Sequence, residues 1–387
     1  MTTRTTMLVL LTAAGAAHGQ SEYTVTDLGS IGNETAAWAI SDGGLVAGVA
    51  LDADNAAKGF LWDSGVLTPI EPDPAFTQAQ TMGVADDGSV ALLSFSLGKF
   101  DARASLVVGG AAVDLGGFAP HAIGADGSVL GTAGYDAGSG FRAEHACVWD
   151  GALTILGSLS GSEWSMATDS STEGWIVGHA IPSGVLQPVA TIWIGATPAS
   201  LGTLGGSWSS ALAINDARQV VGVAETASGA PHAFRFHLSA AGAVTNRLDL
   251  GVLAGDDSAA YGINDAGTIV GTSHGSAFVW ASGTIRDLNT LIPSGEGWTL
   301  QVATGINTDG QIVGWGLHGA GGQRAFLLTP ASCPGDLDGN GVLNLDDINL
   351  FAGAFVGGDL AADMDGNGVL NLDDINLFAA GFLAGCP

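Results

Sequence analysis

A short motif recurs seven times along residues 39–330 and limits the folds that this chain can adopt. Most copies contain a β-branched residue, a turn rich in Asn, Asp and Gly, and a strand such as Ile-Val-Gly. The copies are AISDGGLVAG at 39, GVADDGSVAL at 83, AIGADGSVLG at 122, ATDSSTEGWIVG at 167, AINDARQVVG at 213, GINDAGTIVG at 262 and GINTDGQIVG at 305. Neighbouring copies lie roughly 40–50 residues apart, a period typical of propeller blades rather than of helical solenoids.

Each copy predicts a unit of four short strands. The turn joins the first two strands, because Asp accepts backbone amides and Gly adopts positive φ. A third, apolar strand follows, as in HACVW at 145, HAFRF at 232 and RAFLL at 324, and a fourth ends in Leu-Gly, as in LDLG at 248. No stretch of this region shows a sustained helical period, so it is predicted to be all-β.

The first and last units do not match in their number of strands. After the last third strand, the chain leaves through Thr329-Pro330, whereas an extra strand, YTVTDLG at 23–29, precedes the first complete unit. In a circular array this strand would complete the last unit and leave no sheet edge bare. We therefore predict a seven-bladed β-propeller over residues 20–330, with eight blades or an open β-solenoid as the alternatives.

These units resemble the HAF-type extracellular repeat, which is named for the His-Ala-Phe found here at 232–234. The fifth and sixth units, LGTLGGSWSSALAINDARQVVG and LGVLAGDDSAAYGINDAGTIVG, match it best, whereas the second and fourth depart from it. The resemblance covers most of 23–330 and implies an exported repeat protein, with little indication of a biochemical activity.

The segment DGNGVLNLDDINLFA occurs twice without change, at 338–352 and at 365–379. Carboxylates and amides fall at the spacing of an EF-hand loop, and hard oxygen ligands at this spacing bind one Ca²⁺ per loop. Each loop runs into a predicted helix with an apolar stripe, Ile348, Phe351 and Phe355 in the first and Ile375, Phe378 and Phe382 in the second. The expected ligands of the two ions are Asp336, Asp338, Asn340, Val342, Asn344 and Asp347, and Asp363, Asp365, Asn367, Val369, Asn371 and Asp374.

A duplicated loop-helix unit with Asp at the twelfth loop position resembles a type I dockerin. The Cys-Pro opening at 333–334 and the Gly-Cys close at 385–386 resemble the Gly-Cys-ended variety, and the resemblance covers 333–387 of the expected domain at 331–387. The resemblance implies a calcium-dependent module that binds a cohesin-like or cell-surface protein through loop positions ten and eleven. Here these are Leu345-Asp346 and Leu372-Asp373, where clostridial dockerins usually carry small hydroxyl residues. The alternative is that both leucines are core residues at helix starts.

The cysteines and the N-terminus indicate export. Residues 1–19 contain Arg4, an apolar run and small residues, and so read as a secretory signal peptide. Cys333 and Cys386 bracket the doubled segment, and we expect a disulfide between them. Cys147 is expected to be a buried small hydrophobe. The localisation expected is secreted or extracellular, with attachment to the cell surface through the dockerin-like domain.

Charge and motifs narrow the classes of function. A net charge of −28 disfavours nucleic acid and anionic membranes as partners, and no further segment is apolar enough to span a bilayer. The turn acids Asp42, Asp216, Asp265 and Asp309 recur once per unit, which favours structural capping over catalysis. The pattern G-x-S-x-G at 271–275 lies in an all-β unit and is interpreted as a loop.

Tryptophans form two groups. Trp38, Trp164, Trp208 and Trp298 lie at first strands and are candidates for stacking on a polysaccharide, whereas Trp62, Trp149, Trp193 and Trp280 lie on third strands and are expected in the core. Two hypotheses remain: a non-catalytic recognition or structural propeller docked through its dockerin-like domain, or a polysaccharide-degrading enzyme of a cellulosome-like complex. The lack of an acid pair outside the repeat pattern favours the first.

Overall fold

The computed structural model describes residues 22–96, 102–136, 142–159, 164–319, 322–331, 335–338 and 343–384. The chain divides into two compact units, of which one is Tyr23–Pro330 and the other contains Ala331–Pro387. In the described part, no helix is long and apolar enough to cross a membrane.

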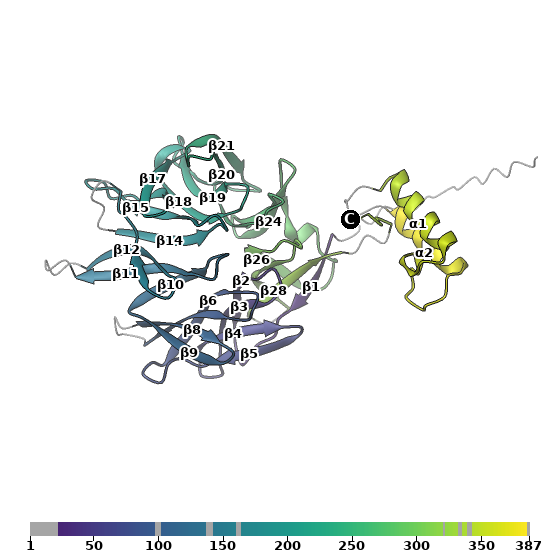
Figure 1. The fold of residues 1–387 in the computed structure, drawn as a ribbon, viewed down its shortest axis with the longest axis horizontal. Coiled ribbons are helices and arrows are strands. Elements are labelled where there is room, and N and C mark those ends of the chain that lie inside the picture. Colours follow the sequence, from purple (N-terminus) through teal and green to yellow (C-terminus); the bar gives the residue numbers. More distant parts are fainter. Residues whose placement is uncertain are drawn as a thin grey trace, which may run out of the picture. The chain divides into compact units, whose positions relative to one another are not determined.

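Tyr23–Pro330 is an all-β propeller of antiparallel sheets, interrupted in its described residues by one short 3-10 helix, Leu288–Thr290. In Figure 1, β2, β6, β10 and β26 lie toward the middle of this unit, and β5, β9 and β21 lie at its outside. The four-stranded sheets are β2 to β5 (Thr35–Ile40, Val46–Leu51, Ala57–Asp63, Val66–Ile70), β6 to β9 (Gln78–Val84, Val90–Phe95, Ala102–Val108, Ala111–Gly116), β18 to β21 (Gly205–Ile214, Gln219–Thr226, Pro231–Leu238, Val244–Gly251) and β22 to β25 (Ser258–Ile263, Ile269–Ser273, Ser276–Ala281, Thr284–Asp287).

The other two sheets contain the remaining strands. One has eight strands, β10 to β17 (Phe118–Ile123, Val129–Asp136, Arg142–Trp149, Leu153–Ile155, Trp164–Ser170, Trp175–Ile181, Val189–Ile194, Thr197–Gly202). Its two halves are joined through a single parallel residue pair, Glu144 with Trp164. The last sheet combines β26 to β28 (Trp298–Ile306, Ile312–His318, Gln323–Pro330) with β1 (Tyr23–Asp27).

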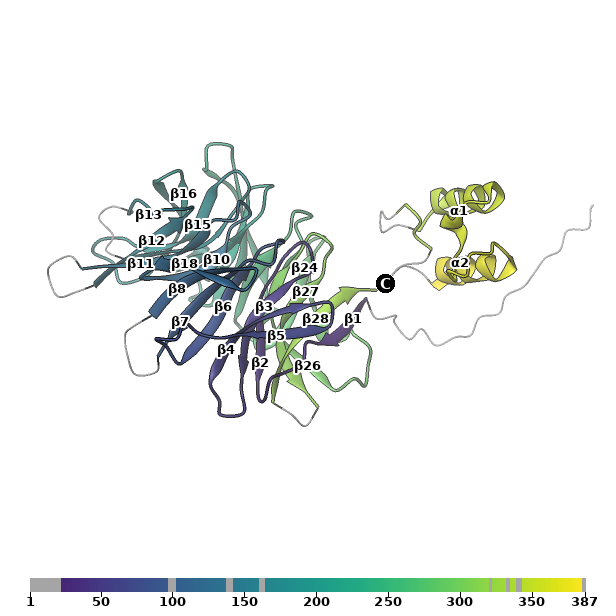
Figure 2. The ribbon, with the colours of Figure 1, turned by 60° about the horizontal axis from the view of Figure 1, so that its bottom comes forward.

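The N-terminal strand completes the last sheet, as the sequence predicts. Strand β1 runs antiparallel to β28, from the pair Tyr23 and Pro330 to the pair Asp27 and Phe326, and Figure 2 shows the two strands side by side. The last sheet is also bonded to the first, because the Thr304 hydroxyl donates to the Ala37 carbonyl over 3.0 Å. The array of sheets is therefore closed on itself, unlike the open solenoid considered as an alternative.

At three of the junctions between sheets, one hydroxyl contacts both the Ala and the Leu-Gly of the repeat. Ser258 Oγ, at the start of β22, accepts from the Ala233 amide of the preceding third strand and donates to the carbonyl of Gly251, which ends the fourth. Ser209 makes the same two contacts with Ala190 and Gly202. The alanines have no exposed surface, so a larger side chain would push the neighbouring sheet away.

The same clamp joins the two ends of the propeller. The Thr35 hydroxyl accepts from the Ala325 amide over 2.9 Å and donates to the Gly29 carbonyl over 3.1 Å. Gly29 follows β1, so this N-terminal strand holds the place that a fourth strand holds elsewhere. Leu28, the Leu of the same Leu-Gly pair, is 2% exposed and packs with Phe60 and Leu327.

The core lies between neighbouring sheets. Of the third-strand tryptophans, Trp62, Trp193 and Trp280 are buried, and Trp149 packs against such a cluster, as predicted. Cys147 is also buried as predicted, and burial raises the pKa of its thiol to about 12, which leaves it unreactive at neutral pH.

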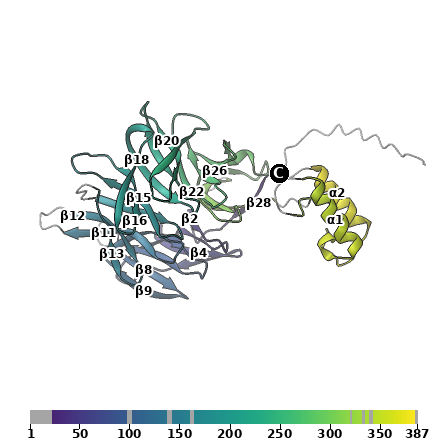
Figure 3. The ribbon, with the colours of Figure 1, turned by 45° about the horizontal axis from the view of Figure 1, so that its top comes forward.

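The described part of the C-terminal unit is a pair of helices, each preceded by an acidic loop. Helix α1 spans Leu345–Gly357 and α2 spans Leu372–Ala384, with a short 3-10 helix, Leu360–Ala362, between them. Figure 3 shows α1 and α2 side by side. Phe351 and Phe378 stack face to face with ring centroids 4.1 Å apart, and with Ala362 they are the buried side chains of a small core.

Candidate metal centres and the central cavity

The second acidic loop brings three carboxylates together. Asp363, Asp365 and Asp374 each offer one oxygen, and these oxygens lie within 4.8 Å of one another. Asp363 is partly buried, Asp365 is exposed, and Asp374 has no exposed surface. Three carboxylates so close repel one another unless a cation lies between them.

Local hydrogen bonds shape this loop. The two oxygens of Asp363 accept from the amides of Asn367 and Gly368, and Asp365 accepts from the Asn367 amide. Gly368, at the sixth loop position, has φ of +79°, a left-handed conformation that favours glycine. The sharp turn predicted at this position is therefore present, and it folds the loop back toward Asp374.

The first loop has the same cluster in its described residues. Asp336, Asp338 and Asp347 offer oxygens within 4.8 Å of one another, and Asp347 has no exposed surface. The expected ligands Asn340 and Val342 lie outside the described residues, as do Cys333 and Cys386, the expected disulfide, and the expected signal peptide at 1–19.

The two buried carboxylates are held ionised by backbone amides. Hydrogen bonds from the backbone, first of all from Asn344, lower the pKa of Asp347, and those from Asn371 do the same for Asp374. Desolvation acts in the opposite direction but is the weaker influence in both loops. Each loop thus presents a charged carboxylate at its inner end at neutral pH.

Asn344 and Asn371 are helix N-caps in this structure. The Asn344 side chain accepts from the Asp346 amide over 2.6 Å, and Asn371 accepts from the Asp373 amide over 2.7 Å. Their amide oxygens are therefore engaged with the helices, and a water molecule commonly bridges the ninth loop residue to the ion in EF-hands. The sequence pattern alone did not indicate this second role.

The apolar stripe of each helix is narrower than predicted. Phe351, Phe355, Phe378 and Phe382 pack in the small core, whereas Ile348 and Ile375 are 39% and 38% exposed. Leu345 and Leu372, at the helix starts, are 66% and 67% exposed. The interpretation of both leucines as core residues is therefore wrong, because two short helices bury only the faces that they turn to each other.

The turn acids of the propeller cap turns, and several cap the turn of a neighbouring unit. Asp42 accepts from the Thr308 amide, Asp86 from the Gly43 amide, Asp216 from the Thr172 amide and Asp265 from the Asp216 amide. Within a turn the cap is often Asn, as where Asn264 accepts from the Thr268 amide. These acids therefore stabilise contacts between sheets.

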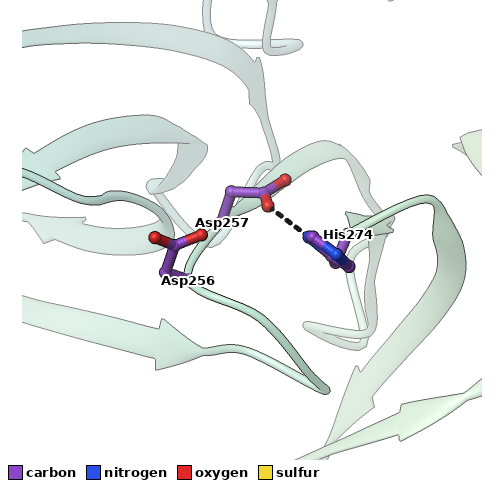
Figure 4. A group of neighbouring side chains, drawn as sticks. All are labelled: Asp256, Asp257 and His274. Carbon is purple, nitrogen blue, oxygen red and sulfur yellow. Dashed lines mark hydrogen bonds and ion pairs between the residues drawn. The ribbon is translucent and has the colours of Figure 1, made fainter.

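The pattern G-x-S-x-G is a structural turn. Ser273 is 1% exposed, and its hydroxyl donates to the Asp257 carbonyl and accepts from the Leu253 amide. Figure 4 shows His274 directed at Asp257, with 2.9 Å between Nδ1 and the carboxylate, and Asp256 lying to one side. The hydrogen bond to Asp257 raises the pKa of His274, and the Ser273 hydroxyl is bonded to the backbone at Asp257 and Leu253 rather than to this ring.

A cavity of about 540 Å³ lies among the first strands of the propeller. Every first strand contains a β-bulge, and in each unit one residue skipped by the strand register lines this cavity. The skipped residues are Trp38, Met82, His121, Thr168, Leu212, Tyr261 and Thr304. The residue that follows each bulge is mostly Ala or Gly. The bulge residues therefore differ from unit to unit much more than the residues that follow them.

Asp169 breaks the repeat inside this cavity. In the other six units the residue after the bulge is alanine or glycine: Ala39, Gly83, Ala122, Ala213, Gly262 and Gly305. Burial raises the pKa of Asp169 to about 7, although hydrogen bonds from the amides of Ile214 and Ser170 oppose the shift. The sequence held this signal, because an alignment of the seven copies places one Asp in a column of small residues.

Of the tryptophans expected to meet a sugar, Trp38 lines the cavity. Trp298 stacks instead on His318, with ring centroids 4.3 Å apart, and Trp164 packs at a tilt against His179, with ring centroids 5.0 Å apart. Trp315, on β27, also lines the cavity and had no role in the sequence analysis. Trp315 pairs with Val302 of the adjacent first strand, which lines the same cavity, and the repeat pattern does not indicate this.

No family model and no curated protein matches this chain. The solved structures similar to it include TolB from Acinetobacter baumannii, with 12% identity, a TM-score of 0.43 and coverage of 74% of this chain and 64% of TolB. A puromycin hydrolase structure has 16% identity and a TM-score of 0.48, with 77% and 52% covered. The β-propeller domain of the Trilobed protease from Pyrococcus furiosus has 11% identity and a TM-score of 0.38, with 69% and 95% covered. The chain thus spans between half and two thirds of the first two of these structures.

Proposed function

We propose that this chain is an exported recognition protein, in which a seven-bladed propeller is anchored through a calcium-dependent dockerin-like module. The observation that carries the proposal is the repeated arrangement of the C-terminal unit. Each acidic cluster lies at the start of a helix, and each helix exposes the same Leu-Asp pair beside it. A metal-dependent module with two equal faces is suited to docking.

The donor set supports Ca²⁺ in both loops. The side chains concerned offer carboxylate and amide oxygens, which hard cations prefer, and no His or Cys joins either described cluster. Asp363, Asp365 and Asp374 would hold the second ion, with the Asn367 side chain and the Val369 carbonyl as further donors. Asp336, Asp338 and Asp347 would hold the first. Bound calcium would neutralise the carboxylates and fix each loop to its helix.

A count of seven blades is supported by the strand pairing. The halves of the eight-stranded sheet share one parallel residue pair, so each half serves as a separate blade of four strands. With the five four-stranded sheets this makes seven, the last of which includes β1. The count agrees with one turn motif and one cavity-lining bulge residue per repeat.

The partner would bind the exposed helix starts. Leu345 and Leu372 place large apolar side chains in solvent beside Asp346 and Asp373, which are also exposed. Exposed apolar residues in matching positions are typical of protein contacts. A cohesin-like or cell-surface protein is the proposed partner, and the identity of the two repeats allows it to bind in two orientations related by a half turn.

Docking should tolerate the loss of one face. Changing Leu345-Asp346 to Ala-Ala should weaken partner binding by about 0.4 kcal/mol, because one of two equivalent modes is lost, RT ln 2. Changing Leu372-Asp373 as well should weaken the binding free energy by several kcal/mol, because both apolar anchors are then gone. The loss of one hot-spot residue typically costs about 2 kcal/mol or more of binding free energy. The affinities of the single-pair and double-pair variants are measured by titration against a surface protein that the unchanged chain captures in the presence of calcium.

A matched control for docking is Leu350→Ala, which removes another exposed leucine of α1 outside the Leu-Asp pair. It should leave the affinity unchanged. If the single change at 345–346 already abolishes binding, the module docks in one fixed orientation and the repeat serves calcium binding and packing.

Polysaccharide hydrolysis is the alternative for the propeller. Glycosidases commonly need two carboxylates flanking the sugar bond. Asp169 is the one carboxylate among the described residues of the 540 Å³ cavity, which favours recognition. Incubation with a panel of polysaccharides and screening on a glycan array distinguish the two: released reducing sugar would support the enzyme.

A further inference from the structure

We propose that the channel through the propeller binds a small organic ammonium ion bearing a hydroxyl group, with Asp169 as its counter-ion and Trp38, Tyr261 and Trp315 as the walls around it. This deepens the recognition role proposed above by naming a ligand class. It does not depend on the calcium loops.

The channel has two parts that meet at Asp169. The part lined by the bulge residues is called the aromatic cavity, because Trp38, Tyr261 and Trp315 line it. A second cavity of about 570 Å³, called the acidic mouth, is lined by the turns of the same units. Both share Asp169 and a girdle of apolar side chains, which consists of Ile40, Val84, Ile123, Ile263 and Ile306.

The charges around the channel favour a cation. Among the described lining residues of both parts there is no Lys or Arg, and the acidic mouth adds Asp42, Asp86, Asp126, Asp216 and Asp265 to Asp169. Burial lowers the pKa of His121, the other ionisable group of the aromatic cavity besides Asp169 and Tyr261, to about 4, so its ring is neutral at physiological pH. With 38 acids against 10 basic residues in the whole chain, the potential in the channel is negative.

Aromatic rings beside a carboxylate recognise ammonium ions in particular. Ring faces attract a cation through their quadrupole, and the attraction grows where water is excluded. The aromatic cavity of about 540 Å³ is within the range of small-molecule sites. A metal ion, by contrast, would require several oxygen ligands, and the aromatic cavity offers a single carboxylate among its described lining residues.

Two polar groups in the channel wall have no partner in the described protein. Ser170 Oγ is buried without a hydrogen bond, on a residue that is 6% exposed and lines the acidic mouth next to Asp169. Trp38 Nε1, in the aromatic cavity, is likewise buried and unpaired. Such groups are costly unless something else satisfies them. A ligand with a hydroxyl group could accept from the indole or pair with the serine.

Ser170 also departs from the repeat. Its place in the other units is taken by Ile or Val: Ile40, Val84, Ile123, Ile214, Ile263 and Ile306. One unit therefore replaces the small apolar residue by Asp169 and the girdle residue by Ser170. Two adjacent polar replacements at the junction of the two parts indicate a specific polar contact, because the six other units show that the fold does not require them.

The test is a calorimetric titration of the full chain with choline and with its neutral isostere, in which carbon replaces the quaternary nitrogen. We expect choline to bind and the isostere to bind at least about tenfold more weakly, since a desolvated cation–aromatic contact adds about 2 kcal/mol. Equal affinities would show an apolar cavity without charge recognition and would overturn the proposal. So would an absence of choline binding, or tighter binding of a neutral sugar.

Variants locate the site. Asp169→Ala introduces the residue that three other units carry and should weaken choline binding by about tenfold or more. Trp38→Leu should also weaken it, whereas Trp208→Leu, on another first strand but outside the cavity lining, should not. If Asp169→Ala fails to fold, the comparison of choline with its isostere on the unchanged chain still decides.

The pH dependence gives a separate readout. Because burial raises the pKa of Asp169 to about 7, its charge is lost below that pH and choline should bind more tightly at about pH 8 than at about pH 5.5. A flat profile between these values would contradict the role of Asp169. Calcium-dependent docking of the C-terminal module is measured in a separate assay. A negative result for docking therefore does not bear on choline binding, and a negative result for choline does not bear on docking.

Discussion

Removal of calcium should unfold the C-terminal helices and leave the propeller intact. In hydrogen exchange of the full chain, the amides of α1 and α2 should be protected in calcium and exchange rapidly in chelator. Helices of this length are marginal in water, and the core between them has three buried residues, Phe351, Ala362 and Phe378. At a free calcium concentration of about 100 times Kd, one site adds about 2.7 kcal/mol, so exchange should accelerate by about 100-fold when that site is emptied.

A matched pair of substitutions tests which carboxylates hold the ion. Asp374→Asn removes the charge of a buried side chain in the second cluster, whereas Asp373→Asn makes the same change one residue earlier on an exposed side chain. The first should lower calcium affinity by about tenfold or more, and the second should leave it nearly unchanged. Protection of α1 and α2 that persists in chelator would show that the module folds without metal.

Deletion of residues 20–29 should destabilise the propeller severely. The deletion removes β1, leaves β28 as a bare edge, and takes away Leu28, together with Tyr23 and Val25, which pack against a core cluster. Loss of one buried leucine costs about 3 kcal/mol, and the strand as a whole should cost more. For a domain of this size we expect the Tm to fall by about 10 °C or more, with aggregation through the open edge.

Two point variants distinguish the stability lost with a buried side chain from the stability lost by shortening the chain. Leu28→Ala should reproduce part of the loss, about 2–4 kcal/mol, whereas Thr26→Ala on the exposed side of β1 should have little effect. Differential scanning calorimetry of the parent, the truncated chain and the two point variants gives the order of stability. A truncated chain that melts at the temperature of the parent would mean that β1 contributes nothing to closing the ring.

Local chemistry made much of the fold predictable. The turn motif, the apolar third strand and the Leu-Gly pair predicted the sheets, and the unmatched strand at 23–29 predicted the pairing of β1 with β28. The loop carboxylates were predictable for the same reason: Asp363, Asp365 and Asp374 are close in sequence, so a single turn at Gly368 brings them together.

Several features depended on contacts between distant residues. Ile348 and Ile375 have the periodicity of core residues, but in the described part of the C-terminal unit each helix has one partner helix, and these side chains stay 39% and 38% exposed. The turn acids were predicted to cap turns, but only the packing of neighbouring sheets shows that Asp42 caps the turn at Thr308, 266 residues away.

The sequence by itself determined the propeller repeat, the closing strand and the paired acidic loops, because turns and strand periodicity act over a few residues. Only the tertiary structure decided what faces the channel. A β-bulge in each first strand turns one residue inward, and seven such residues from distant parts of the chain form a single wall, with Asp169 next to the bulge residue Thr168. Side-chain direction at a bulge depends on pairing with the next strand, and the neighbours of that side chain depend on closure of the ring.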